Sequence, residues 1–449
     1  MKGITVREFI DTKKLSKLQI TIIFICLASA LLDGLDVVIL GFIAPTLKAD
    51  WGLSNSDLAP IMSAALAGLA FGALILGPIA DKFGRKIVFC LCLVGFGSFT
   101  LLTARSDTIS EMVILRFLTG IFMGGILPQI VTLITDYSPS RLRGRMVTLI
   151  IAGYAVGCAS GGLLVTAFIE EHGWRFVLSI VGGLPLIMAI LAYFYLPESL
   201  GFMVLKKYAS EKIYQIALKI DHTFDKNTTQ FVVPDISHHS SNPIKTLFER
   251  TYIVSTFGLW VCYGAAIYVS YLLSSWLPIL ISSNGFNHHE ANLVSIFYQL
   301  GGPIGCIIAG FLIDKMDVFK GLLVTYVLAI LSVLAAVIIP SSVLAYMLTC
   351  MSIGMWGGGI VAGLNSLSST IYPLEVRSTG NSFMHSFARI GAVFSVFVGA
   401  MMLNAGFSAK NVFLSLLIPF SISVFVILLI KIQTTRHQVK IFKSTLPTV

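Results

Sequence analysis

Long apolar runs fill most of the chain and alternate with short polar segments. A helix needs about 20 apolar residues to cross a bilayer, and twelve runs of about this length or longer are present, six before and six after a polar stretch in the middle of the sequence. They cover residues 18–47, 58–79, 87–104, 112–135, 146–169 and 176–196, then 251–281, 291–313, 321–339, 343–370, 378–403 and 411–430. The pattern predicts an all-α integral membrane protein with 12 transmembrane helices.

The polar stretch divides the chain into three predicted parts. Residues 1–200 are expected to form an N-terminal six-helix bundle, 201–250 a cytoplasmic linker and 251–449 a C-terminal six-helix bundle. The region 198–250 holds 13 charged residues, which favours a water-exposed segment. An amphipathic pattern near residues 206–220 predicts one short helix within it.

Composition supports a membrane protein and excludes a string of soluble domains. Of the 449 residues, 56% are hydrophobic and only 12% are charged, whereas soluble domains carry about 25% charged residues. The net charge of +9 does not require a nucleic-acid partner. With the N-terminus inside, 25 of the 31 Lys and Arg residues fall in inside segments and 4 in outside loops. The positive-inside rule therefore accounts for the basic balance and predicts that both termini are cytoplasmic.

The two halves repeat the same inside loop. Gly77 begins a segment that reaches Asp81-Lys82 after the second span, and Gly310 begins a similar one that reaches Asp314-Lys315 after the eighth. Pro139 precedes Arg143 by four residues, as Pro373 precedes Arg377. Matching loops in two six-span halves are typical of an internally repeated transporter.

Motifs of enzymes and cofactor sites are not found in the sequence. It has no Walker loop, His-Glu-x-x-His pair, Ser/His/Asp set or haem motif. All seven cysteines lie in apolar runs without a Cys-x-x-Cys pair, which argues against a disulfide framework or a zinc site. We therefore expect neither an enzyme nor a bound cofactor or metal.

Four charged residues lie inside predicted spans, where each costs at least about 2.5–3.5 kcal/mol on insertion scales. They are Asp33, Asp36, Arg116 and Arg389. Asp33 and Asp36 are three residues apart, so their carboxyls face the same side of a helix. Two close carboxyls do not both ionise readily in a low dielectric, which suits one of them to carry a proton. We predict both as proton-coupling residues; the alternative is that they only pair with Arg116 to join helices.

The two intramembrane arginines lie one in each half. A planar guanidinium binds a carboxylate through two parallel hydrogen bonds. Arg116 and Arg389 are therefore predicted substrate-binding residues for a carboxylate, with a permanent salt bridge to an aspartate as the alternative. His385 lies one turn before Arg389 on the same face and is a candidate proton relay. Its alternative role is that of an ordinary hydrogen-bonded polar residue.

The repeated loop leads to a family. Residues 77–86 are similar to the signature between helices 2 and 3 of the major facilitator superfamily, Arg116-Phe117 resembles its helix 4 motif, and Pro197-Glu198-Ser199 resembles the end of its helix 6. The chain resembles that superfamily over essentially its whole length. The resemblance implies two six-helix bundles with internal repeats that alternate access to a central site.

A narrower resemblance begins in the first span. Asp33-Gly34-Leu35-Asp36, followed by Gly41 to Pro45, is similar to the aromatic acid:proton symporter family. It implies proton-coupled uptake, by symport, of an aromatic acid or related carboxylate such as benzoate, hydroxybenzoate or muconate, for aromatic compound catabolism. The implied setting is the bacterial cytoplasmic (inner) membrane. The implied partners are a small organic carboxylate, protons and the lipid bilayer, and nothing in the sequence indicates an obligate protein partner.

A proton-driven drug or metabolite antiporter of the same fold is the alternative function. The glycines at 153, 157 and 161 resemble the antiporter motif of helix 5, but Cys158 stands where that motif has proline. This departure favours symport.

An aromatic acid is held by ring stacking and by a few polar groups. Side chains of these kinds within predicted spans are expected to bind substrate, with plain core packing as the alternative for each. They are Gln129, Tyr263, Phe297, Tyr298, Gln299 and Trp356.

The charged inside loops are predicted to gate the cytoplasmic side. Asp81 can meet the positive N-terminal end of a helix, and Arg85 can pair with Asp136. For the loop cations the alternative is topology alone. The predicted gating residues are Gly77, Asp81, Gly84, Arg85, Asp136, Arg143, Asp314 and Arg377.

Overall fold

The structure is a computed structural model. It describes residues 2–11, 15–206, 208, 210–221, 224, 229–231, 243–249, 252–338, 342–372 and 374–445. Within these ranges eleven helices are long and apolar enough to span a membrane. One of them, α6 (Ser140–Tyr195), has 56 residues and contains two predicted spans, because its backbone leaves the helical conformation at Gly173, where φ is 74°. A positive φ is readily adopted by glycine. The prediction of 12 spans is confirmed.

Contacts divide the chain into two compact units. Unit 1 comprises Met1–Leu40 and Ala64–His238, and unit 2 comprises Gly41–Ser63 and His239–Val449. The remaining long helices of the N-terminal half begin and end close to the predicted apolar runs. They are α2 (Lys17–Trp51), α3 (Asn55–Phe83), α4 (Arg85–Thr103) and α5 (Ile109–Tyr137). Helices α2 and α3 each contribute residues to both units.

The helix ends follow from local chemistry. Helix α5 begins after Thr108, whose side chain accepts a hydrogen bond from the Glu111 backbone N–H. Helix α11 (His288–Met316) begins with a capping box formed by Asn287 and Glu290. Such caps satisfy the N–H groups that a first helical turn leaves without intrahelical partners.

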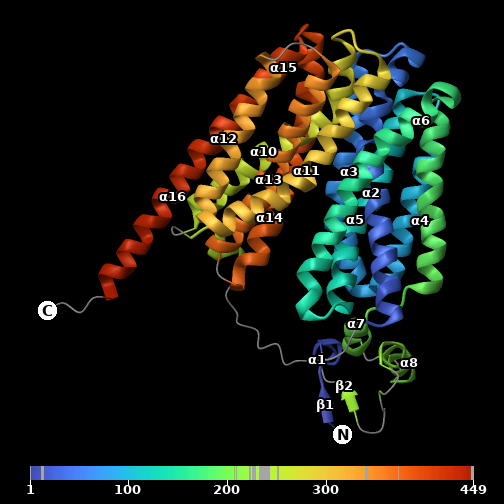
Figure 1. Ribbon diagram of the computed structural model, residues 1–449. Coiled ribbons are helices and arrows are strands. Elements are labelled where there is room, and N and C mark those ends of the chain that lie inside the picture. The colour runs from blue at the N-terminus through green and yellow to red at the C-terminus, as the bar shows by residue number, and fades with distance from the viewer. Residues whose placement is uncertain are drawn as a thin grey trace. The chain divides into compact units, whose positions relative to one another are not determined.

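Residues 2–11, 200–205, 210–220 and 229–231 form a small cap at one end of unit 1 (Figure 1). Strand β1 (Lys2–Ile4) pairs in parallel with β2 (Thr229–Phe231). The Phe9 ring lies edge-on to Phe224 and Phe231, at centroid distances of 5.1 and 5.5 Å. The cap thus ties the start of the chain to its middle.

Three short helices accompany these strands. They are α1 (Val6–Asp11), α7 (Leu200–Leu205) and α8 (Ser210–Ile220). Helix α8 lies within the amphipathic segment predicted near 206–220 and contributes buried Ala217 and Ile220 to the core of unit 1. The two three-residue strands are a minor addition to the predicted all-α class, which is confirmed.

Unit 2 holds the C-terminal helices (Figure 1). Besides α11 they are α9 (Pro243–Leu247), α10 (Ile253–Ser282), α12 (Val318–Ile338), α13 (Val343–Ile371), α14 (Leu374–Asn404), α15 (Ala409–Ser415) and α16 (Leu417–Thr445). Helix α10 packs along α14 and also contacts α13. This meeting of three helices positions the polar cluster described below.

Large apolar side chains are exposed along the long helices. Phe194 is 73% exposed, Leu74 67% and Ile390 62%. Exposed apolar surface on this scale is unusual for a soluble monomer but is what a helix presents to lipid.

Candidate functional site

A buried ion pair joins α2 to α5 in unit 1. The Arg116 guanidinium donates from Nη2 to Asp36 Oδ2 at 2.8 Å and from Nη1 to Oδ1 at 3.0 Å. Thr100 of α4 also donates to Oδ1, at 3.3 Å. The side chains of Arg116 and Asp36 are only 1% and 0% exposed. Both ends of the guanidinium fork therefore hold Asp36, as in the alternative interpretation of Arg116, and its predicted contact with substrate stays a prediction.

Asp33 lies one turn earlier on α2 and is also buried, at 1% exposure. It is close enough to the thiols of Cys92 on α4 and Cys158 on α6 to interact with them electrostatically. Gln129 of α5 is buried too.

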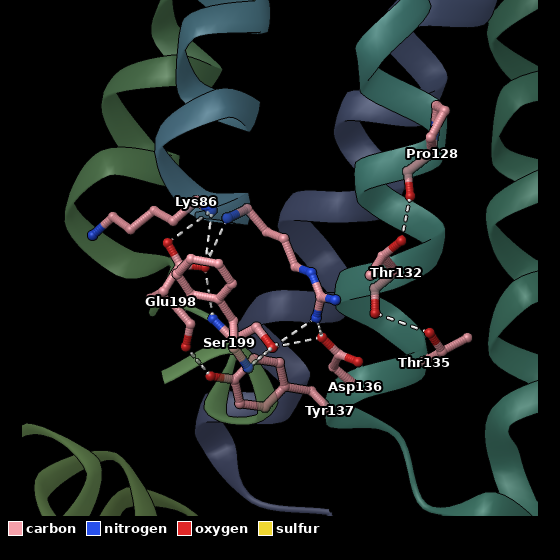
Figure 2. A network of polar contacts seen from close by, with 10 residues as sticks. Lys86, Pro128, Thr132, Thr135, Asp136, Tyr137, Glu198 and Ser199 are labelled. Carbon is pink, nitrogen blue, oxygen red and sulfur yellow. Dashed lines mark hydrogen bonds and ion pairs between the residues drawn. The ribbon is translucent and has the colours of Figure 1, made fainter. Parts of the chain in front are cut away.

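A second polar network lies at the end of α5 and the start of α4 (Figure 2). Arg85 Nη1 donates to Asp136 Oδ2 and, at 2.9 Å, to Ser199 Oγ. Ser199 Oγ in turn donates to Asp136 Oδ2 at 2.6 Å. The predicted pairing of Arg85 with Asp136 is present in the structure, although its role in gating is not tested by this contact.

Glu198 completes this network as the cap of α4. Its Oε1 accepts from the backbone N–H of Arg85 at 2.9 Å and from that of Lys86 at 3.3 Å. A carboxylate at a helix N-terminus satisfies open N–H groups and complements the helix dipole. Gly84 sits directly before the helix with φ at 107°, and a side chain there would collide with the Glu198 carboxylate. Gly84 is thus required by both backbone conformation and space.

Tyr137 anchors the chain around Glu198. Its hydroxyl donates to the Glu198 backbone carbonyl at 2.5 Å, and its own carbonyl accepts from Gln19 Nε2 at 2.7 Å. Tyr137 is fully buried. Glu198 was singled out in the sequence only as part of a family motif, and its capping role had no local signal, since its partners are 113 residues away.

The other predicted gating residues do not take part in the hydrogen bonds just described for Arg85, Asp136 and Ser199. Asp81 is exposed at the end of α3, and the position of Gly77 on the same helix has open space around it. Arg143 lies near the start of α6, where its charge reaches Asp136. Arg377 is half-buried and donates from Nε to the Tyr372 carbonyl at 3.3 Å.

The counterpart of Asp81 in the second half, Asp314, lies on α11, and its side chain is outside the part of the chain that is described. The gating roles of all these residues stay predictions.

Asp11 fastens the N-terminal cap to α6. Its Oδ1 accepts from the Ser140 backbone N–H at 2.5 Å, and its Oδ2 from the Ser140 hydroxyl at 2.7 Å. These two bonds, the backbone one first, hold the pKa of the Asp11 carboxyl below its ordinary value because they favour the ionised form. Charge on Asp11 therefore stabilises the cap.

In unit 2 a polar cluster lies where α10, α13 and α14 meet. Tyr263 of α10 shares a hydrogen bond of 3.1 Å with His385 Nδ1, and His385 Nε2 shares one of 2.9 Å with Asn365 Oδ1 on α13. Tyr263 is 3% exposed, whereas His385 is exposed. Arg389 lies one turn after His385 on α14 and is half-buried. It is close enough to interact electrostatically with both His385 and Tyr263.

This cluster brings together three predicted site residues, Tyr263, His385 and Arg389, and adds Asn365. The sequence analysis missed Asn365 because a single amide in an apolar run carries no pattern. The only local signal was a polar residue inside a span, which is costly unless it is bonded.

The remaining predicted aromatic and amide residues line other parts of unit 2. Tyr298 is buried, with its hydroxyl donating to the Ser270 carbonyl at 3.3 Å, and Gln299 Nε2 donates to Ser274 Oγ at 3.1 Å. Phe297 on α11 and Trp356 on α13 are half-buried. Substrate contact by these four residues stays a prediction.

Comparison with known proteins identifies the chain. A family model described as the Major Facilitator Superfamily matches residues 26–373 and 259–447. The chain belongs to this superfamily. Among the residues described, no group of three or more His, Cys, Asp or Glu side chains is placed to hold a metal ion. Membership makes the chain a multi-pass membrane transporter rather than an enzyme.

Curated relatives in the superfamily match nearly the whole chain. A 4-hydroxybenzoate transporter of Pseudomonas aeruginosa is 34% identical over 96% of this chain and 96% of its own length. A gallate transporter of Pseudomonas putida is 34% identical over 93% and 92%. A benzoate transport protein of Acinetobacter baylyi is 30% identical over 96% and 93%. The resemblance to the aromatic acid branch of the superfamily is confirmed.

Solved structures of the superfamily share the fold. The Escherichia coli xylose transporter in a partially occluded inward-open conformation has a TM-score of 0.69 at 17% identity, covering 92% of this chain and 98% of that one. A D-xylose-proton symporter has a TM-score of 0.70 at 18% identity, covering 91% and 96%. At these identities the likeness establishes the architecture and not the substrate.

Proposed function

We propose that this protein takes up an aromatic acid together with protons across the bacterial cytoplasmic membrane. The observation that carries the proposal is the identity of 34% over 96% of the chain to a 4-hydroxybenzoate transporter. Gallate and benzoate transporters are also among the relatives. What these relatives carry in common is a benzene ring bearing a carboxylate, so we take a hydroxylated benzoate as the favoured substrate.

The cluster around Arg389 is the proposed carboxylate site. A guanidinium can hold a carboxylate through two parallel hydrogen bonds. Arg389 is half-buried, and one turn away His385 is exposed, so the cluster is not sealed within unit 2. The Tyr263 ring packs against His385, and its hydroxyl adds a polar group to the cluster.

Arg116 is less suited to bind substrate. Its guanidinium already holds both oxygens of Asp36 and is out of contact with solvent. We assign Arg116 to the Asp36 pair, in which its two hydrogen bonds join α5 to α2. Asp33, which is buried one turn before Asp36, is the second proposed proton-coupling residue.

Transport requires alternating exposure of the site to the two sides. We infer rigid-body rocking of an N-terminal bundle, residues 1–200, against a C-terminal bundle, residues 251–449, joined by the linker 201–250, with both termini cytoplasmic. The Arg85–Asp136–Ser199 network is the proposed inside gate. The side chains of Arg85 and Asp136 are only 20% and 26% exposed. Breaking the network therefore costs free energy, because it separates two partly buried charges from each other.

Uptake of labelled acids tests the proposal. Cells that produce the protein should take up one or more of benzoate, 4-hydroxybenzoate, protocatechuate and cis,cis-muconate faster than cells without it. Arg389→Lys keeps the charge but removes the planar fork, so we expect the apparent KM to rise by about ten-fold or more at unchanged expression. Lack of uptake of every acid, together with export of preloaded compounds, would support the antiporter alternative instead.

A further inference from the structure

Side chains from three helices of unit 2 form a closed ring of hydrogen bonds. The Tyr263 hydroxyl meets His385 Nδ1 at 3.1 Å, His385 Nε2 meets Asn365 Oδ1 at 2.9 Å, and Asn365 Nδ2 meets the Tyr263 hydroxyl at 3.4 Å. Both ring nitrogens of His385 therefore have a partner. The imidazole and phenol rings also lie against each other, with centroids 4.6 Å apart.

Asn365 determines which nitrogen of the neutral histidine carries the proton. Its Nδ2 donates to the Val361 carbonyl at 2.9 Å, which turns the acceptor Oδ1 toward His385. Because Oδ1 can only accept, the hydrogen must be on His385 Nε2. Nδ1 of the neutral ring is then an acceptor, and the Tyr263 hydroxyl donates to it.

Adding a proton to His385 reverses one of these bonds. An imidazolium has two donors and no acceptor, so Nδ1–H must donate to the Tyr263 oxygen. That oxygen already accepts from Asn365. The Tyr263 hydrogen then has to turn away from the ring of bonds toward another acceptor.

Arg389 is the charged group that faces this ring. It lies four residues after His385, on the same face of α14, and its charge reaches both His385 and Tyr263. The other titratable groups whose charge would reach Tyr263 are Tyr271 on α10 and Cys306 on α11, both neutral in ordinary surroundings near pH 7. Repulsion from Arg389 opposes a second positive charge on His385, and a carboxylate bound to Arg389 removes that opposition.

We propose that the Tyr263 hydroxyl is a proton-dependent hydrogen-bond donor to the carboxylate that Arg389 binds. A hydronium ion of the solvent transfers its proton to His385 Nδ1 and leaves a water molecule. The new Nδ1–H donates to the Tyr263 oxygen, the Tyr263 hydroxyl turns to the carboxylate, and no other covalent bond forms or breaks. Substrate binding and protonation of His385 therefore favour each other, as linkage requires. Asn365 is the positioning residue. It keeps the hydrogen of the neutral imidazole on Nε2, so the Tyr263 hydroxyl donates to Nδ1 until His385 is protonated. The inference rests on the proposed function and specifies where one coupling proton binds.

Equilibrium binding without a gradient tests this directly. Labelled 4-hydroxybenzoate is titrated onto the purified full chain in detergent between pH 5.5 and 8, a range in which a carboxyl with an ordinary pKa near about 4 stays ionised. For the unsubstituted chain we expect Kd to fall as the pH falls. His385→Gln, which cannot titrate, should give a Kd that does not vary with pH.

Tyr263→Phe should likewise abolish the pH dependence and should raise Kd at pH 5.5 by about ten-fold, because one hydrogen bond to a charged group is lost. Asn365→Ala should act in the opposite direction at high pH. Without its acceptor the neutral ring can carry its hydrogen on Nδ1, so affinity at pH 8 should rise toward that at pH 5.5. Tyr268→Phe is the matched control, since Tyr268 lies on α10 but lines an apolar groove with Phe394; it should keep both affinity and slope.

Failure of this inference and failure of the proposed function give different results. If the unsubstituted chain binds 4-hydroxybenzoate and the His385→Gln and Tyr263→Phe proteins keep its pH dependence, the inference is overturned and the proposed function stands. A uniform loss of affinity in Asn365→Ala at all pH values also counts against it, because a merely structural role predicts that result. If the unsubstituted chain binds no aromatic acid at any pH, the proposed function fails and this inference fails with it.

Discussion

Replacing Asp36 by Asn is expected to destabilise the protein more than removing both members of its ion pair. The substitution leaves the Arg116 guanidinium charged, out of contact with solvent and without its carboxylate. An uncompensated buried charge is costly, whereas a pair of uncharged groups of similar shape is not. Arg116→Gln should also destabilise the protein, because it leaves the buried Asp36 carboxylate without its guanidinium.

The structure sets the size of the effect. The two side chains are 1% and 0% exposed and share two hydrogen bonds of 2.8 and 3.0 Å. Breaking a buried pair by removing one partner costs about 3–5 kcal/mol. The attraction between two unit charges 4 Å apart, about 4 kcal/mol at an effective dielectric constant of about 20, is of the same order. The double substitution should therefore recover more than half of the loss caused by either single one.

The exposed pair Arg175–Asp107 is the matched control. It has the same two residue types at 2.9 Å, but its side chains are 43% and 82% exposed. Exposed pairs contribute about 0–1 kcal/mol, so Asp107→Asn should have little effect. The free energy of unfolding is measured for each protein in mixed micelles with increasing SDS.

Two outcomes would refute the reasoning. One is that Asp36→Asn costs no more than Asp107→Asn. The other is that the Asp36 and Arg116 substitutions add to within about 0.5 kcal/mol, as independent sites do. Either result would mean that the pair does not persist as a closed ion pair in the resting protein.

Three further predictions concern the end of unit 1 that holds Gly84 and Glu198. Gly84→Ala should destabilise the protein by about 1–3 kcal/mol, because a side chain at φ 107° is strained and meets Glu198; an unchanged unfolding free energy would contradict this. Glu198→Gln should cost about 0.3–1 kcal/mol through the weaker cap of α4, and high salt should reduce the difference; equal stability at low salt would argue against the cap. Asp11→Asn should lower stability at neutral pH only. The depressed pKa of Asp11 means that its stabilising effect is present above the ordinary aspartate range and is lost as the pH falls through the folded-state pKa, so a gap between the two proteins that persists in strong acid would refute the contact with Ser140.

The membrane architecture was predictable because one physical quantity, the thickness of a bilayer, sets the length of an apolar run. Helices α2 to α5 begin and end within a few residues of their predicted runs. Where the prediction and the helices differ, the cause is local. The two spans 146–169 and 176–196 run on as α6, because the polar segment 170–175 between them stays helical except at Gly173.

The ion pair was predictable only as an alternative. Intramembrane charges must find partners, which indicates that Arg116 pairs with an aspartate, but Asp33 and Asp36 are three residues apart and equally charged. The choice of Asp36 depends on how α2 is rotated against α5, and the sequence pattern does not contain that rotation.

Contacts between distant segments were beyond sequence reasoning. Glu198 caps a helix that begins more than 100 residues earlier, and Asn365 holds a histidine 20 residues away on another helix. The pairing of β1 with β2 joins two three-residue segments that have no strand pattern of their own. In each case the partner is chosen by tertiary packing, whereas local sequence sets only the residue type.

The most direct test of the account is accumulation in proteoliposomes. Purified protein is reconstituted, an inward proton gradient is imposed, and labelled 4-hydroxybenzoate is followed with and without a protonophore. The account predicts accumulation above the external concentration that collapses when the protonophore is added, and none when Arg389 is replaced by Ala. Equilibration without accumulation, or loss of preloaded substrate as protons enter, would contradict proton-coupled uptake.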